Sequence, residues 1–239
     1  TLVWHMRCPR KASTERDVYP PSQCPSDYTL EELLERKNNG TRGAHFDEWR
    51  GMLDELADLL LSAKEPSGNP IPVLLRPFHE FTGDWFWWGR TNTPETYRQA
   101  WKEMVNYLQD ARQVHNILWV LSPNTPATNG FSFEPYYPGD RYIDVVAFDH
   151  YDSDDGHFLE SYSRDIELVG EFASTHHKVA AVTEVGRPLH MFGASSQPSW
   201  FTAQAIKPLF ETKWGGSFAF VSLWRNAPWE QFVPVAGDG

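Results

Sequence analysis

Six short apolar runs dominate the hydrophobic pattern of the 239-residue chain. Each run is four to six residues long and is rich in β-branched, aromatic and leucine side chains. Continuous runs of this kind are typical of strands buried on both faces of a parallel sheet. The runs cover residues 2–5, 73–76, 117–121, 143–148, 179–183 and 218–223. The pattern therefore predicts six strands.

Helical periodicity fills most of the intervals between these runs. The patterned stretches cover residues 30–36, 46–64, 93–108, 162–173 and 200–210. Thr93 followed by Pro94 is a strong helix start, because Thr caps the first turn and Pro fits the first helical position. Pro208 is expected to kink or end the last helix. Strands that alternate with helices predict right-handed βαβ units around a parallel sheet.

Polar or aromatic residues follow each apolar run. They are Trp4 and His5, His79 and Glu80, Ser122, Asp149 to Tyr151, Glu184, and Trp224 with Arg225. Chemistry at the carboxyl end of every strand is typical of a (β/α)8 barrel, whereas a doubly wound sheet would usually carry a glycine-rich phosphate loop. The predicted fold is therefore α/β, of the (β/α)8 TIM-barrel type, with six of the eight strands.

Composition narrows the possible functions. A hydrophobic fraction of 41% and a charged fraction of 22% indicate a globular protein. The net charge of −11 argues against nucleic-acid binding, and no apolar run is long enough to span a membrane. The chain has 11 tryptophans, 9 tyrosines and 15 phenylalanines. Such rings either line a sugar-binding surface or form a tryptophan-rich core.

Two strand-end glutamates, Glu80 and Glu184, are the strongest catalytic candidates. Acetal hydrolysis needs one carboxylic acid to protonate the leaving oxygen and a second carboxylate to attack the anomeric carbon or to activate water. The alternative is that either glutamate is an exposed loop acid. Both follow apolar runs directly, which favours the catalytic interpretation.

Several longer motifs surround these residues. Residues 72–89 read PVLLRPFHEFTGDWFWWG, and residues 182–186 read VTEVG. The first motif resembles the acid/base segment of glycoside hydrolase family 26, the clan A β-mannanases, and the second resembles its nucleophile segment. The sequences WH at 4–5, DHY at 149–151 and LWRNA at 223–227 resemble its motifs at strands three, six and eight. The five matches lie in the family's order and span almost the whole chain.

The resemblance implies a role for each matched residue. Glu80 would be the general acid/base and Glu184 the nucleophile of a retaining double displacement. The implied substrate-binding residues are His5, His79, Trp85, Asp149, Tyr151, Trp224 and Arg225. Apolar surroundings should raise the pKa of Glu80, and hydrogen bonds from Tyr151 and His79 should keep Glu184 ionised.

No metal or other cofactor is predicted. The candidate ligands at the strand ends are His5, His79, Glu80, Asp149, His150 and Glu184. No strand carries an H-x-H pair, and His150 should alternate away from Asp149 and Tyr151. Lys178 precedes its strand, which argues against Schiff-base chemistry.

The resemblance implies an endo-β-1,4-mannanase that hydrolyses mannan-type polysaccharides, with no obligate protein partner. The alternatives are a β-1,3-xylanase, a mixed-linkage β-glucanase, or a non-catalytic carbohydrate-binding barrel. Secretion or cell-surface location is implied by the resemblance alone. Cys8 and Cys24 form either a disulfide or two free thiols. Residues 1–239 are expected to be one catalytic barrel domain, truncated at both ends, with strands three to eight present.

Overall fold

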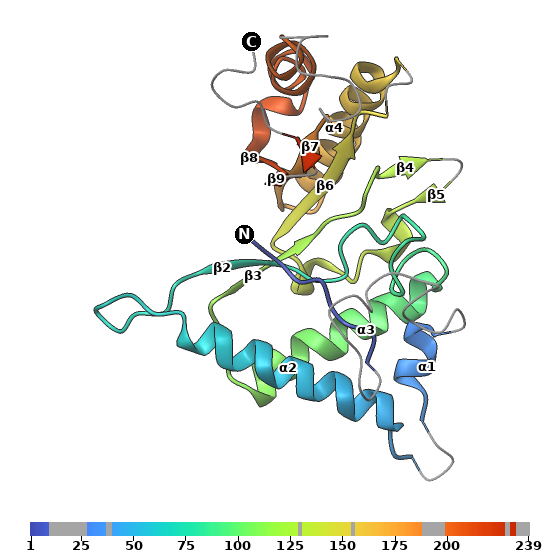
Figure 1. Cartoon of the computed structure of the whole chain (residues 1–239), viewed down its shortest axis with the longest axis vertical. Coiled ribbons are helices and arrows are strands. Elements are labelled where there is room, and N and C mark those ends of the chain that lie inside the picture. The colour runs from blue at the N-terminus through green and yellow to red at the C-terminus, as the bar shows by residue number, and fades with distance from the viewer. Residues whose placement is uncertain are drawn as a thin grey trace. The chain divides into compact units, whose positions relative to one another are not determined.

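The chain divides into two compact units in the computed structural model (Figure 1). The first comprises Thr1–Leu121 and Phe133–Asp144, and the second comprises Ser122–Ser132 and Val145–Gly239. The structure describes residues 1–9, 28–36, 40–128, 131–153, 156–187, 199–227 and 230–232. No helix among these residues is long and apolar enough to cross a membrane.

Three parallel strands in chain order form the sheet of the first unit. They are β1 (Leu2–Val3), β2 (Val73–Arg76) and β3 (Ile117–Leu121). The helical segments of this unit are α1 (Leu30–Leu34), α2 (Ala44–Ser62), α3 (Pro94–Asn106), η1 (Tyr107–Ala111), η2 (Glu134–Tyr136) and η3 (Asp140–Tyr142). Helices α2 and α3 lie on the same side of β2 and β3 (Figure 1), as right-handed βαβ connections require.

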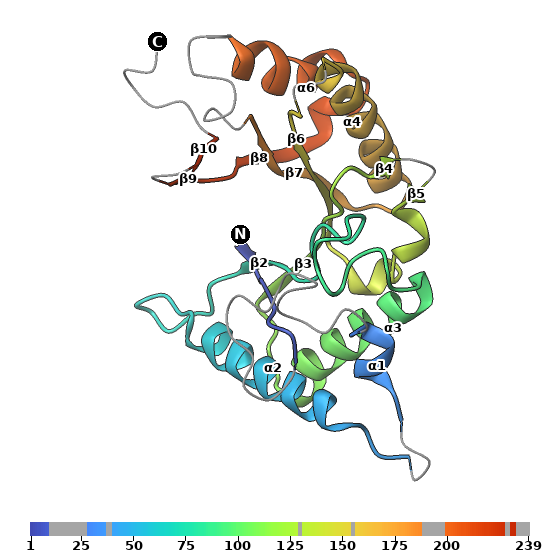
Figure 2. The same cartoon turned by 45° about the vertical axis from the view of Figure 1, so that its right-hand side comes forward.

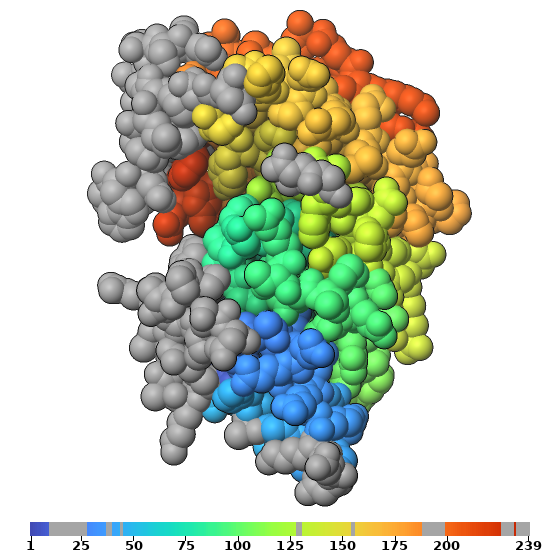
Figure 3. Space-filling model, turned by 90° about the vertical axis from the view of Figure 1, so that its right-hand side faces the viewer, coloured from blue at the N-terminus to red at the C-terminus, as the bar shows by residue number. Residues whose placement is uncertain are grey.

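Side-chain hydrogen bonds mark where α3 and α1 begin. The Thr93 side chain accepts a hydrogen bond from the backbone N–H of Thr96 at 3.2 Å, so Thr93 caps α3 as predicted. Helix α1, in blue, packs against α3, in green (Figure 3). The first backbone N–H of α1, at Leu30, donates to Oδ1 of Asn92 at 2.7 Å. The predicted helices over residues 30–36, 46–64 and 93–108 are confirmed, with small differences at their ends.

The second unit also contains three parallel strands in chain order. They are β6 (Val145–Tyr151), β7 (Val179–Gly186) and β8 (Phe218–Leu223). The helical segments among its described residues are α4 (Phe158–Thr175), η5 (Phe201–Ile206), α6 (Pro208–Glu211) and η6 (Gly215–Ser217). Two small antiparallel pairs join β4 (Ala127–Thr128) to β5 (Phe131–Ser132) and β9 (Asn226–Ala227) to β10 (Glu230–Gln231). Helices α4 and α6 lie side by side (Figure 2).

All six predicted strands are present, but β6 and β7 are longer than the apolar runs. Asp149 and Tyr151 lie inside β6, and Glu184 lies inside β7, because their backbones continue the pairing between the two strands. Strand β8 is only half-buried, so the expectation of burial on both faces is wrong there. Pro208 begins α6 directly after the π-helical turn η5, and so separates two helical segments.

The state of one cysteine is also defined. Cys8 is fully buried and disulfide-bonded, which excludes a free thiol at that position. Cys24, the only other cysteine in the sequence, lies outside the described residues.

Candidate active site

The loop after β2 presents Glu80 between two buried phenylalanines. Phe78 and Phe81 are fully buried, while Glu80 is partly exposed. Phe78 and Glu80 both adopt positive φ angles, of 47° and 53°. This region is unfavourable for residues other than glycine, so packing of the two phenylalanines must hold the loop in place. The strained backbone turns the Glu80 side chain out of the core.

Trp85 fixes the carboxylate of Glu80. The indole N–H of Trp85 donates a hydrogen bond to Oε2 of Glu80 at 2.8 Å. The Trp85 ring lies directly over Gly83, where a Cβ atom would come within 2.4 Å of a ring carbon. Gly83 is therefore required for this placement of the ring. The resemblance implies a substrate-binding role for Trp85, which stays a prediction, and the sequence did not predict its hydrogen bond to Glu80.

The His79 ring belongs to an aromatic cluster in the first unit. It lies edge-on to the His5 ring at a centroid distance of 4.6 Å and is 4.8 Å from the Phe86 ring. Burial lowers the pKa of His79 well below its ordinary value of 6.5, and the positive charge of Arg76 lowers this pKa further. His79 is therefore neutral at ordinary pH, and it can only position groups and donate or accept a hydrogen bond.

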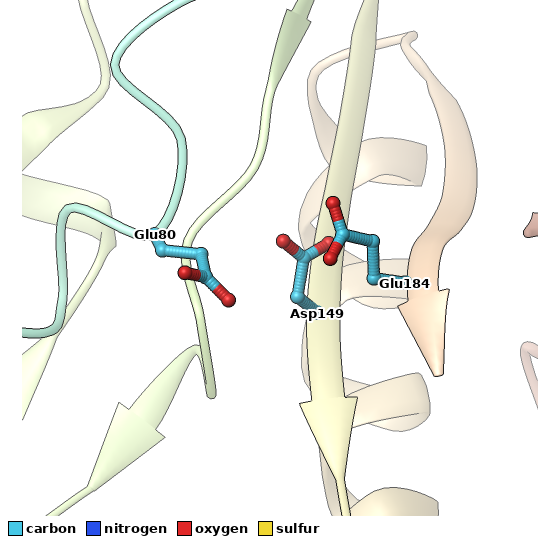
Figure 4. A group of neighbouring side chains, drawn as sticks. All are labelled: Glu80, Asp149 and Glu184. Atoms are coloured by element: carbon cyan, nitrogen blue, oxygen red, sulfur yellow. The ribbon is translucent and has the colours of Figure 1, made fainter. Parts of the chain in front are cut away.

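In the second unit, Asp149 and Glu184 face each other on neighbouring strands (Figure 4). Their carboxylate oxygens lie within 4.8 Å of one another. The hydroxyl of Tyr151 donates a hydrogen bond to Oε2 of Glu184 at 2.6 Å. This contact confirms the predicted hydrogen bond from Tyr151 to Glu184. The arrangement suits a carboxylate that must act as a nucleophile.

His150 lies on the opposite face of β6 from Asp149 and Tyr151, as the alternation predicts. Its Nδ1 is 2.8 Å from Oδ2 of the buried Asp165, and its Nε2 is 3.1 Å from the Ser161 hydroxyl. Both partners lie on α4. Because both ring nitrogens are engaged there, His150 does not join the acidic pair, and it serves as a clamp between β6 and α4.

Trp224 and Arg225 follow β8. The Arg225 guanidinium lies over the Trp224 ring, 5.4 Å from its centroid. Trp224 is partly exposed and Arg225 is exposed, so both can reach a ligand. Four tryptophans near the predicted site residues differ in exposure: Trp85 and Trp224 are partly exposed, while Trp87 and Trp88 are core residues.

The predicted site residues fall into two groups. His5, His79, Glu80 and Trp85 belong to the first unit, and Asp149, Tyr151, Glu184, Trp224 and Arg225 belong to the second. Contacts within each group are those given above. The separation between Glu80 and Glu184 stays a prediction, as do the roles that the resemblance implies.

Comparison with known proteins finds a matching family model and several similar proteins. The family model described as glycosyl hydrolase family 26 matches residues 1–217. A mannan endo-1,4-beta-mannosidase from Bifidobacterium adolescentis is 34% identical over 73% of this chain and 18% of its own length. Mannan endo-1,4-beta-mannosidase A and B from Caldalkalibacillus mannanilyticus is 36% identical over 66% of this chain and 29% of its own length.

A solved structure with the same fold is GH26C from Muricauda sp. It is 27% identical with a TM-score of 0.85, and the match covers 98% of this chain and 62% of that chain. The chain spans less than a third of the length of each of the two mannan endo-1,4-beta-mannosidases described above. The likeness in structure shows a fold of the TIM-barrel type, as the strand-end chemistry predicted. Since the family model also matches most of its length, the chain belongs to glycosyl hydrolase family 26.

Proposed function

We propose that this protein is an endo-β-1,4-mannanase that cleaves mannan-type polysaccharides with retention of configuration. The observation that carries the proposal is the contrast between its two glutamates. Glu184 lies in a strand and accepts a hydrogen bond from the Tyr151 hydroxyl, whereas Glu80 lies on a strained loop and accepts one from the Trp85 indole N–H. Two carboxyl groups in different environments are what the acid and nucleophile roles need.

In the first step, a Glu184 carboxylate oxygen bonds to the anomeric carbon as the glycosidic C–O bond breaks. The Glu80 carboxylic acid gives its proton to the leaving oxygen. In the second step, Glu80 takes a proton from water, whose oxygen displaces Glu184 from the sugar. The carboxylate of Glu184 and the proton of Glu80 are both restored, so no cofactor enters the reaction.

The proposal of mannan as substrate rests on the activity named for the two curated relatives, mannan endo-1,4-beta-mannosidases, and on two partly exposed tryptophans. The faces of Trp85 and Trp224 suit the apolar C–H faces of pyranose rings, and Arg225 beside Trp224 supplies donors for sugar hydroxyls. A polysaccharide is too large to enter a cell intact, which supports secretion or display at the cell surface as part of the proposal.

The decisive experiment measures reducing ends released from galactomannan, mixed-linkage β-glucan and β-1,3-xylan. We expect release from galactomannan and none from this polymer with Glu184→Ala. Glu160→Gln, an exposed change on α4, is the matched control and should retain wild-type rates. Release of reducing ends from the glucan alone or from the xylan alone would mean that this polymer, and not mannan, is the substrate. Binding of polymer without release by the wild-type chain would indicate a non-catalytic carbohydrate-binding barrel.

A further inference from the structure

Two hydroxyl groups converge on one oxygen of the Asp149 carboxylate. Ser122 Oγ donates to Oδ1 of Asp149 at 3.2 Å, and Thr183 Oγ1 donates to the same oxygen at 2.7 Å. The two hydroxyl oxygens are 2.8 Å apart. All three residues are buried, and Asp149 has no exposed surface. The reaction as described above gives neither hydroxyl a role.

A β-bulge brings Thr183 to this position. In the pairing of β6 with β7, Phe148 is opposite Val182 and Asp149 is opposite Glu184, so Thr183 is the extra residue. In a regular strand, neighbouring side chains point to opposite faces. The bulge relaxes this constraint, so Thr183 and Glu184 can both approach Asp149 although they are adjacent in sequence.

Burial and a like charge both oppose ionisation of Asp149. A carboxylate without surface exposure loses hydration, and the Glu184 carboxylate lies within 4.8 Å. Both effects favour the protonated acid. Hydrogen bonds to the carboxylate act in the opposite direction. Whether Asp149 carries a charge therefore depends on the donors that surround it.

Resting on the proposed glycosidase function, we propose that Ser122 and Thr183 are positioning residues that hold Asp149 fixed and ionised beside Glu184. Two negative charges then stabilise the positive charge that develops on the sugar ring in the transition state. Among the residues of the second unit that the structure describes, the titratable groups beside Asp149 include Glu184 on β7 and Tyr151 on β6, which bonds Glu184. His150 is held by α4 on the other face.

The test is the pH profile of kcat/KM for Ser122→Ala and Thr183→Val, each measured alone. The reaction requires Asp149 and Glu184 both to be ionised, so kcat/KM falls below a certain pH, on the acid limb of the profile. Loss of one hydroxyl donor should move this acid limb to higher pH by about one unit. Ser122→Thr and Thr183→Ser keep a hydroxyl and should restore the wild-type limb. The proposal would be overturned if kcat/KM were lower at every pH while the acid limb stayed at the same pH or moved to lower pH.

Ser161→Ala is the matched control, since it removes a hydroxyl that bonds the other face of β6. Its acid limb is expected at the wild-type pH. A second measurement does not depend on turnover: the carboxyl carbon of Asp149 is titrated by 13C NMR without substrate. An upward shift in both variants supports the inference even if no polysaccharide is cleaved, which would refute only the proposed function. An unchanged titration of Asp149 refutes the inference itself.

Discussion

Glu80 and Glu184 differ in the groups that hold them, and in the proposed mechanism this difference sets what each would do in the two steps of hydrolysis. Glu80 accepts from the indole of Trp85, and Glu184 accepts from the hydroxyl of Tyr151. Only the acid can be bypassed, because a substrate with a good leaving group departs without protonation.

Replacement of the two residues should therefore give different kinetic results. Glu184→Ala is expected to abolish cleavage of every substrate. Glu80→Ala should lose galactomannan cleavage and retain the first step on an aryl mannoside with an activated leaving group, seen as a burst of released phenol. Equal loss of both activities in both variants would mean that these roles are wrongly assigned.

Gly83 tests how closely Glu80 depends on Trp85. Gly83→Ala places a methyl group where the Trp85 ring now lies, so the ring must move and its hydrogen bond to Glu80 is lost. We expect cleavage of galactomannan to fall by about 100-fold, the order reported for small misplacements of reacting groups. Gly51→Ala on α2 is the control, because no neighbouring group lies within 4 Å of the methyl group that it adds. Unchanged activity of Gly83→Ala would show that the indole is dispensable.

The neutral His79 makes stability depend on pH in a defined direction. Its folded-state pKa lies well below 6.5, so in acid the unfolded chain binds a proton that the folded chain does not. The contribution of neutral His79 to the free energy of unfolding is therefore fully present above the pKa of this histidine in the unfolded chain. It decreases as the pH falls below that pKa, by about 1.4 kcal/mol per pH unit at most.

Urea unfolding at pH 7 and pH 5.5 measures this effect. The wild type should lose more free energy of unfolding between these values than His79→Gln does. His115→Gln, at an exposed position, should lose as much as the wild type. An equal loss for wild type and His79→Gln would show that His79 is not neutral in the folded protein.

At the scale of elements, the apolar runs predicted each strand, but the strand ends could not be placed from them. Asp149 and Glu184 are polar, so the hydrophobic pattern stops before them, although their backbones continue the pairing of β6 with β7. The β-bulge at Thr183 and the positive φ of Glu80 depend on contacts between distant segments. Local patterns carry no signal for either feature. The motifs around Glu80 and Glu184 are specific enough to predict a role for each residue, and these roles stay predictions.

The clamp between β6 and α4 is an element-scale prediction. Asp165 is fully buried and bonds His150, so its removal leaves a buried imidazole without its partner. Asp165→Ala should lower the free energy of unfolding by about 3 kcal/mol. Thermal unfolding of Asp165→Ala beside Glu160→Ala, an exposed change on the same helix, measures the difference. Equal stabilities would mean that packing alone joins β6 to α4.

At the scale of the whole molecule, the proposed acid and nucleophile belong to different compact units. A retaining mechanism requires their carboxyl groups to be about 5–5.5 Å apart, whereas inversion needs room for a water molecule. Proton NMR during the first minutes of hydrolysis should show the β-anomer of the product before mutarotation. Initial appearance of the α-anomer would establish inversion and refute the nucleophile role of Glu184.

The interleaved course of the chain has a consequence for recombination between genes. Phe133–Asp144 packs with the first unit although Ser122–Ser132, which precedes it, belongs to the second. No single crossover point therefore separates the codons of one unit from those of the other. A chimera made by one crossover between family members would combine parental residues inside at least one unit. Exchange of an intact unit would require three junctions, so the two units are expected to be inherited together.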